Sequence, residues 1–330
     1  MTESRSGSKT EGERKTESGS KSATLATAHT VAATSLAWLH GQHQLGRGAL
    51  PPDAGIEPAD PDGAYKPLGE YALAASLVLR ERVAGAAETR LARELLERGW
   101  QQLRCGDLLF DRQLRYQLLT DPLETYAHFV RGGYRHRALD QLLAELGELR
   151  SSHAVEMYPN RRLAVANARR VAGLDHRPDW GALADATWLG ARPEPWAIDW
   201  KTAYDMTHTV FHLTDWGARP EGLPEPIASY LHDWLPVWLD VWSEAGLWDL
   251  VGELLIVDAC LARPVGDARA WERLAQAQRP DGLLPRDSDP VDDSDPDATF
   301  KNHEHTAVVA VVAGTLTLAR ALGTGRAATA

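Results

Sequence analysis

The sequence predicts an all-α protein, and three observations support this prediction. Apolar residues recur at helical spacing along most of the 330 residues. Alternating runs of β-branched residues bounded by turns are nearly absent, and turns rich in Pro and Gly divide the chain into about a dozen helical segments. This arrangement predicts an α/α toroid of about six helical hairpins closed into a ring, with an open α-solenoid of stacked pairs as the alternative.

The expected helices follow the turns along the chain. Thr120 offers an N-cap and Pro122 a first-turn proline for the fourth helix, and Pro236 predicts a kink in the ninth. The prolines and glycines of residues 51–67 predict a loop, and residues 106–116 are expected to form a turn and an extended piece. The helices are expected at residues 22–45, 68–83, 87–103, 122–131, 136–149, 161–171, 180–189, 198–216, 226–243, 247–261, 267–278 and 303–322.

The two ends of the chain differ in character. Residues 1–22 are rich in Ser, Gly, Lys, Glu and Thr and contain no apolar segment of the kind that a secretory signal needs, so we expect a disordered tail. A single helical domain is expected over residues 23–330. The most apolar run, residues 307–319, is shorter than the roughly 20 residues of a membrane crossing and predicts a buried helix.

Composition narrows the classes of partner and the compartment. The formal net charge is −11, and the sequence has no basic patch, which argues against nucleic-acid binding and against binding to a membrane surface. Cys105 and Cys260 do not make a disulfide framework, so a reducing, cytoplasmic setting fits best. The expected partner is a small-molecule or peptide substrate.

The segment KTAYDMTHTVFHLTDW, residues 201–216, predicts a helix with an unusual polar face. At about 100° per residue, its titratable side chains fall within one arc of roughly 80°, opposite the apolar side chains of Met206, Val210 and Leu213. Solvated faces usually carry Lys, Arg and Glu, whereas this one is rich in His and Asp, so it is our candidate site. The arc contains Lys201, Asp205, His208, His212 and Asp215.

His208 and His212 are spaced i, i+4, which places both imidazoles on one side of a helix at a separation that one metal ion can span. Asp205 and Asp215 are close enough in this register to act as a third ligand or to orient an imidazole. The residue types favour a divalent metal such as zinc or iron, with general acid and base catalysis by the same side chains as a second role. The alternative is an amphipathic helix whose polar face is simply wet.

A third histidine is expected from the last apolar helix. His303 and His305 are two residues apart, so on a helix they point about 200° away from each other and only one can face a ring interior. His305 adjoins the buried run and is the expected third metal ligand. In the alternative, Asn302 caps the helix and both histidines lie on the surface.

Glu253, Asp258 and Cys260 interrupt an otherwise apolar helix. A buried carboxylate there would have a raised pKa, which suits a general acid, unless it is simply the salt-bridge partner of an arginine. Asp258 is therefore a candidate catalytic residue beside Asp205 and Asp215. Paired with Asp205, it would also suit a carbohydrate-active enzyme if the two carboxyl groups lay about 5–10 Å apart.

The acidic run DSDPVDDSDPD, residues 287–297, permits two interpretations. Four carboxylates follow the spacing of a calcium loop, although Ala298 occupies the glycine position and no helix of an EF-hand precedes them. The alternative is a solvated loop. The four residues are Asp293, Asp295, Asp297 and Glu304.

The segment AWERLAQAQRPDGLLPRD, residues 270–287, resembles one repeat of the α/α toroids, namely the terpenoid cyclases, protein prenyltransferase β subunits and lanthionine cyclases. The likeness is carried by Gln276, Gln278, Asp281 and Gly282 with the apolar helix that follows. It implies a ring of helical hairpins with a central pocket. The DxDD and DDxxD motifs of terpenoid cyclases and the Cys-His pair of lanthionine cyclases are missing.

The whole chain also resembles an uncharacterised family of high-GC bacteria with a T-H-x-x-F-x-L-T-D core. That resemblance brings no established activity with it. The residues that match the core are Thr207, His208, Phe211, Leu213, Thr214 and Asp215.

Together these observations predict a biosynthetic enzyme of specialised metabolism with its pocket at the ring centre. It would act on a mid-sized apolar or peptide-like substrate by cyclisation, elimination or hydrolysis, using a metal held by His208, His212 and His305. Two alternatives stay open: a non-catalytic helical-repeat scaffold that binds a partner protein, and a carbohydrate-active toroid with paired carboxylates.

Overall fold

The computed structural model describes residues 11–51, 54–55, 65–174 and 177–323. Throughout these residues the chain forms 15 α-helices and three short 3₁₀ turns, and it forms no strand, so the all-α prediction is confirmed. The 3₁₀ turns are η1 (Arg104–Gly106), η2 (Pro195–Ala197) and η3 (Pro220–Gly222).

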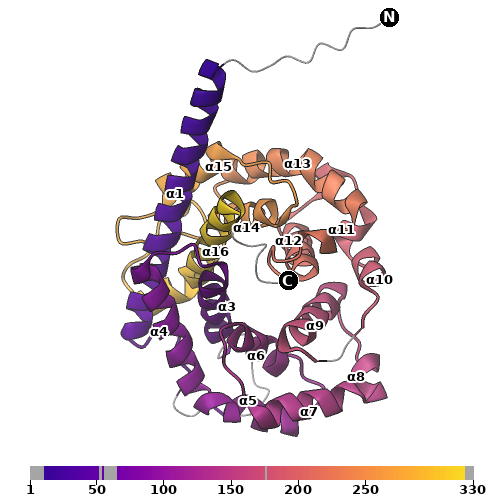
Figure 1. Cartoon of the computed structure of the whole chain (residues 1–330). Helices are drawn as coiled ribbons and strands as arrows, with labels where there is room; N and C mark the ends of the chain where they lie inside the picture. Colours follow the sequence, from indigo (N-terminus) through magenta and orange to yellow (C-terminus); the bar gives the residue numbers. More distant parts are fainter. Residues whose placement is uncertain (1–10, 52–53, 56–64, 175–176, 324–330) are drawn as a thin grey trace, which may run out of the picture.

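Six helices form an inner layer around a common centre (Figure 1). Each contacts the next one along the chain, and the last contacts both its predecessor and the first, so the series of contacts returns to its start. These helices are α3 (Lys66–Glu81), α6 (Asp121–Arg131), α9 (Pro159–Ala172), α12 (Trp200–Thr214), α14 (Trp248–Cys260) and α16 (Pro296–Leu322).

The remaining helices lie outside this layer and cover it (Figure 1). The apolar stripes of the outer helices face inward, as expected for elements with one solvated side. They are α1 (Glu11–Gln44), α4 (Ala86–Gln102), α5 (Asp107–Arg115), α7 (Arg137–Gly147), α8 (Arg150–Ala154), α10 (Trp180–Asp185), α11 (Trp188–Ala191), α13 (Glu225–Glu244) and α15 (Ala268–Ala277).

Inner helices are more uniformly apolar than outer ones because they are covered on several sides. In α14 every residue from Asp249 to Cys260 is buried, since α12, α13, α15 and α16 all contact it. The expected helix over residues 307–319 is likewise buried within α16. By length and composition α16 could cross a membrane, but 67% of its most apolar window is buried inside the protein.

Helix α16 begins earlier than the sequence analysis predicted. The carboxylate of Asp295 accepts hydrogen bonds from the backbone N–H groups of Asp297 and Ala298, which fixes the first turn at Pro296. His303, Glu304 and His305 therefore lie inside the helix, and Asn302 does not cap it. The acidic run is used locally: Asp293 pairs with Arg279 at 2.9 Å and Asp297 with Arg47 at 2.8 Å.

Two other expectations need correction. Residues 106–116 contain α5, whose buried Leu108, Leu109, Arg112 and Gln113 form a helical stripe that Gly106 obscured. The predicted tail is helical from Glu11, because Lys, Glu and Arg have high helix propensity and extend a helix that its later residues already anchor. Residues 1–10 of that tail lie outside the described part of the chain.

The contact between α1 and α16 leaves no room for a side chain at Gly314. A Cβ there would lie 2.5 Å from the carbonyl oxygen of Ala28 and 2.6 Å from the Cβ of Ala32. We expect Gly314→Ala to lower the free energy of unfolding by about 1–3 kcal/mol, because a backbone must move. Urea unfolding monitored by circular dichroism measures this change.

Gly41→Ala in α1 is the matched control, because a Cβ at Gly41 meets nothing within 4 Å. It should raise the free energy of unfolding by about 0.5–1 kcal/mol through helix propensity alone. The packing argument is wrong if the Gly314 variant unfolds at the same urea concentration as the Gly41 variant.

Candidate active site

A cavity of about 950 Å³ lies at the centre of the inner layer. All six inner helices contribute side chains to its wall. A space of this size takes a mid-sized molecule, and its position between helices is a usual one for ligand sites.

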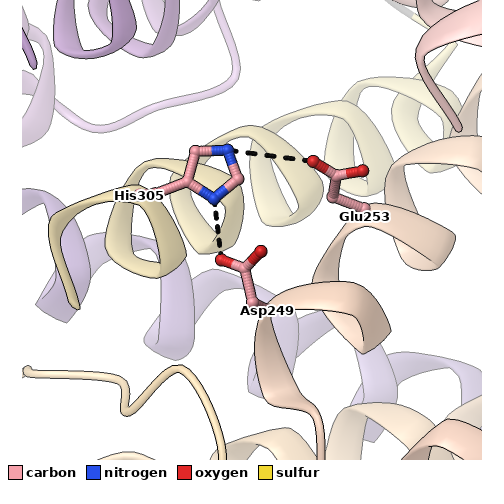
Figure 2. Close-up of side chains that lie close together, drawn as sticks. All are labelled: Asp249, Glu253 and His305. Atoms are coloured by element: carbon pink, nitrogen blue, oxygen red, sulfur yellow. Dashed lines mark hydrogen bonds and ion pairs between the residues drawn. The ribbon is translucent and has the colours of Figure 1, made fainter. Parts of the chain in front are cut away.

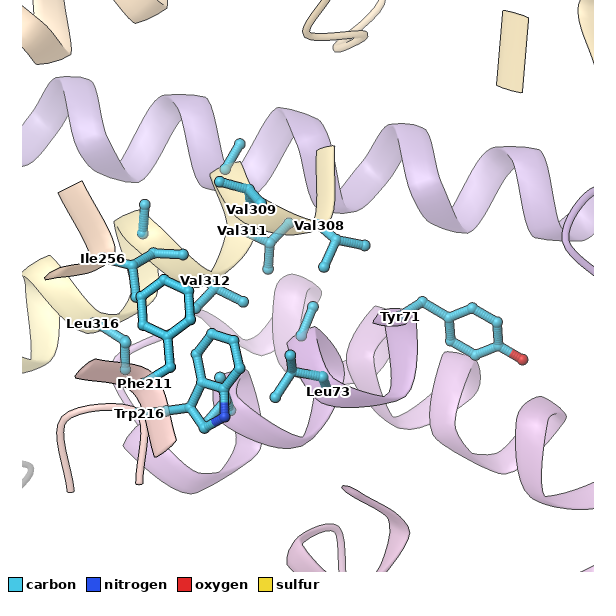
Figure 3. Close-up of a cluster of buried hydrophobic side chains, with 14 of the residues drawn as sticks. Tyr71, Leu73, Phe211, Trp216, Ile256, Val308, Val309, Val311, Val312 and Leu316 are labelled. Carbon is cyan, nitrogen blue, oxygen red and sulfur yellow. The ribbon is translucent and has the colours of Figure 1, made fainter. Parts of the chain in front are cut away.

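One part of the wall is apolar. The side chains of Phe211 and Trp216 stack with their ring centroids 4.4 Å apart, and valines of α16 and Ile256 of α14 lie beside them (Figure 3). This surface favours an apolar body because burying it removes hydrocarbon from water. The apolar wall consists of Leu73, Phe211, Trp216, Ile256, Val308, Val309 and Val312.

Another part of the wall belongs to a buried titratable cluster, Asp249, Glu253 and His305, in which Glu253 and His305 line the cavity and Asp249 contacts His305 from behind the lining (Figure 2). The two acids are one turn apart on α14, and His305 reaches them from the adjacent α16. One ligand atom from each residue lies within 4.8 Å of the others, so this cluster can hold a metal ion. It combines nitrogen and oxygen donors, as many zinc and iron sites do.

Asp249 fixes the orientation of His305. His305 Nδ1 lies 2.8 Å from Asp249 Oδ1, while the hydroxyls of Thr306 and Tyr204 donate to Asp249 at 2.8 Å and 2.6 Å. Burial alone would raise the pKa of Asp249, but the charge of His305 and these hydrogen bonds lower it. Asp249 is therefore ionised, and its carboxylate holds the Nδ1 proton of His305.

The Nε2 atom of His305 faces two further carboxylates. It lies 3.8 Å from Glu253 Oε1 and 3.9 Å from Glu70 Oε1. Two metal–ligand bonds of about 2.0–2.2 Å each span separations of this size. Burial lowers the pKa of His305, but Asp249, Glu70 and Glu253 together raise it to about 10.

Glu253 lies between two histidines. Its side chain is 2% exposed, and its Oε2 atom accepts a hydrogen bond from Thr207 and lies 3.7 Å from His208 Nδ1. Burial raises the pKa of Glu253, which the two histidines only partly offset. A carboxyl group whose pKa is raised in this way is suited to act as a general acid.

The three histidines expected as ligands all line the cavity, but they do not form one ligand set. Among the described residues, the group at ligand distance contains His305 and neither His208 nor His212. His208 Nδ1 donates to the backbone carbonyl of Tyr204 at 2.8 Å, which leaves its Nε2 atom as an acceptor. Burial lowers the pKa of His212 well below its usual value.

The three candidate catalytic aspartates lie in different surroundings. Asp205 lines the cavity and pairs with Lys201 at 2.8 Å. Asp215 is absent from the residues that line it, and it pairs with Arg131 at 2.8 Å and Arg80 at 3.7 Å. Its φ of 46° ends the helix, so the regular 100° spacing stops before it.

Asp258 also lies outside the cavity lining. Its carboxylate accepts backbone hydrogen bonds from Val265 at 2.6 Å and Gly266 at 3.0 Å, so it holds the turn after α14. It forms no ion pair with an arginine of the described residues. The structure does not bring Asp205 and Asp258 together in one cavity wall.

The polar residues that sequence reasoning missed include Glu70, His128, Tyr204 and Asp249. Asp249 carried a signal, since it stands one turn before Glu253 in a helix that is otherwise apolar. Tyr204 stands one turn before His208. Glu70 and His128 lie in helices of ordinary composition, and nothing in their local sequence marks them.

Comparison with known proteins gives one match. A family model described as a domain of unknown function (DUF6895) matches residues 32–315. No curated protein matches the chain, and no solved structure does so either.

The pH dependence of the Asp249–His305 pair follows from the raised pKa of His305. Its contribution to stability is complete below the ordinary histidine pKa of about 6.5 and is lost as pH rises toward 10. In metal-free protein we expect the NMR signal of His305 Hε1 to titrate near pH 10, and in Asp249→Asn well below that.

Thr306→Val is the control for this titration, because it removes one hydrogen bond of Asp249 but keeps its charge. We expect it to move the midpoint of His305 much less than Asp249→Asn does. A midpoint near 6.5 in the unmodified protein would contradict the ion pair.

Proposed function

The chain belongs to the DUF6895 family, and because that family is described only as a domain of unknown function, we propose an activity from the cavity itself. We propose that the protein is a metal-assisted enzyme with its active site at the ring centre. Its substrate is a mid-sized molecule with an apolar or peptide-like body, and the reaction is a cyclisation, an elimination or a hydrolysis.

The observation that carries this proposal is the buried cluster of Asp249, Glu253 and His305, of which Glu253 and His305 line an otherwise largely apolar cavity. His305 Nε2 and Glu253 would hold a zinc or iron ion, and Glu70 is the nearest further carboxylate to His305 Nε2. Asp249 is not a ligand in this arrangement. It orients the imidazole through Nδ1, as carboxylates commonly do beside metal-bound histidines.

The other side chains of the cavity supply binding and proton transfer. A bound metal ion polarises an oxygen of the substrate or lowers the pKa of a bound water. His208 Nε2, which lacks the proton that Nδ1 carries, accepts a proton from the substrate or water. The apolar wall excludes water from the body of the substrate, which strengthens both electrostatic effects.

The two alternatives have less support. A scaffold that binds a protein partner needs no buried titratable cluster, and a carbohydrate-active site built on Asp205 and Asp258 needs both carboxylates in one cleft. A cytoplasmic setting, and a substrate that is neither nucleic acid nor membrane, belong to the same proposal.

Metal content tests the ligand assignment. We expect purified protein, reloaded with Zn²⁺ or Fe²⁺ and desalted, to retain one equivalent, and His305→Ala and Glu253→Gln to retain almost none. Asp249→Asn should bind the metal roughly 10–100-fold more weakly because the imidazole loses its orientation. Inductively coupled plasma mass spectrometry measures the content, and isothermal titration measures the affinity.

The variant His208→Ala/His212→Ala is the matched control, because it removes two imidazoles from the same cavity but leaves the cluster intact. We expect it to keep its metal. Negligible metal in every protein would overturn the metal proposal. Loss of metal in the double variant and in His305→Ala, but not in Glu253→Gln, would support the ligand set expected from the sequence instead.

Catalysis is tested by incubating the reloaded protein with a metabolite extract from cells that carry its gene. We expect liquid chromatography–mass spectrometry to reveal at least one compound that the protein consumes and that Glu253→Gln and His305→Ala leave unchanged. Replacement of His208 by Ala should slow consumption about 10²–10⁴-fold without loss of metal, as removal of a general base does. If the protein and its Glu253 variant consume the same compounds at the same rate, this site is not catalytic.

A further inference from the structure

A chain of three side chains leads from the end of α12 to the cavity wall. Arg131 of α6 donates to Asp215 Oδ1 at 2.8 Å through one nitrogen and lies 3.2 Å from His128 Nδ1 through another. The Arg131 side chain is 6% exposed, so both contacts are protected from water. The sequence analysis expected Asp215 to orient an imidazole of its own helix. In the structure Asp215 contacts Arg131, and Arg131 in turn contacts His128.

The contact with Arg131 determines which nitrogen of His128 carries the proton. A guanidinium group can only donate hydrogen bonds, so Nδ1 of His128 must accept. The proton of the neutral imidazole is then on Nε2. His128 lines the cavity, and Nε2 has no hydrogen-bond partner among the described residues. Nε2–H is therefore the polar group that His128 offers to a bound molecule.

A second imidazole stands in the same wall. His212 lines the cavity, and its Nδ1 atom is buried without a hydrogen-bond partner in the described part of the chain. The stacked rings of Phe211 and Trp216 line the cavity as well. Arg131, which sets the proton position of His128, is not itself part of the lining. The region thus combines one uncharged hydrogen-bond donor, His128 Nε2–H, with a second imidazole and an apolar surface.

We propose that His128, beside His212 and the apolar wall, forms a subsite for an uncharged oxygen acceptor, such as a ketone or amide carbonyl, on a largely apolar ligand. A carboxylate or phosphate would require an unpaired cation, but the cations of the wall are each paired with a carboxylate: Arg161 with Glu124 at 2.7 Å, Lys201 with Asp205 at 2.8 Å and Lys66 with Glu70 at 3.6 Å. Arg131, behind the wall, is neutralised by Asp215. His208 differs in kind, because its Nδ1 donates to a backbone carbonyl and its Nε2 is an acceptor. In this proposal the His128 subsite binds the carbonyl group of the ligand, and the cluster around His305 carries out the reaction.

This inference names the substrate class of the proposed enzyme and rests on the proposed function only in using the same cavity. Binding can be measured with chelator present and without turnover. If the protein retained no metal or consumed no compound, the binding measurement would still test the subsite. If the subsite were absent, the metal content would still test the proposed function.

The test compares two probes that differ in one oxygen, 1-tetralone and its hydrocarbon analogue tetralin. Their dissociation constants are measured by displacement of a fluorescent apolar dye, in the presence of EDTA. We expect His128→Phe to weaken 1-tetralone about 10-fold relative to tetralin, because the carbonyl loses its donor. His208→Phe is the matched control, and it should leave the ratio of the two constants unchanged.

A second measurement does not depend on any variant folding. In protein labelled with ¹⁵N-histidine, we expect 1-tetralone to shift the Nε2 resonance of His128, and tetralin to leave it in place. The proposal is overturned if both probes shift it equally, or if His208→Phe changes the affinity ratio as much as His128→Phe does.

Discussion

Asp249 is buried in the middle of an inner helix, and the surrounding structure must compensate an ionised carboxylate that has left water. An unpaired charge there would be very costly, so each oxygen needs partners. The partners come from two neighbouring helices: Tyr204 from α12, and His305 and Thr306 from α16. Meeting this one requirement fixes the rotation of α16 against α14. The same contact aims His305 Nε2 at Glu253 and Glu70.

Two histidines of the cavity carry their proton on different ring nitrogens, and in each case a neighbouring group determines which nitrogen is protonated. His208 has its proton on Nδ1 because a backbone carbonyl accepts it, whereas His128 has its proton on Nε2 because Arg131 occupies Nδ1. Burial lowers the pKa of His128 to about 3, with the charge of Arg131 adding to the effect. One cavity wall therefore presents a hydrogen-bond acceptor, His208 Nε2, and a hydrogen-bond donor, His128 Nε2–H, from two residues of the same type. This is a way to build an asymmetric site without additional charge.

Much of the helical organisation was predictable because it depends on local spacing. Helical periodicity placed α12 correctly, and it correctly put Asp205, His208 and His212 on one face that lines the cavity. Periodicity placed Asp215 wrongly on this face, because Asp215 has a left-handed backbone conformation that ends the helix. The spacing of apolar residues does not reveal where a helix ends. The cluster itself was only partly predictable. Asp249 and His305 are 56 residues apart, and their contact is set by how two apolar helices pack, which the pattern along either helix does not specify.

The close packing of α1 on α16, with Gly314 against the carbonyl of Ala28, has a consequence for how the chain folds. Helix α1 is synthesised long before α16, its principal neighbour, so this contact cannot form until the residues between the two helices have been made. Contacts of such high sequence separation slow folding, and they leave an apolar surface uncovered in the meantime. During synthesis, α1 is therefore a surface for chaperones to cover until α16 emerges.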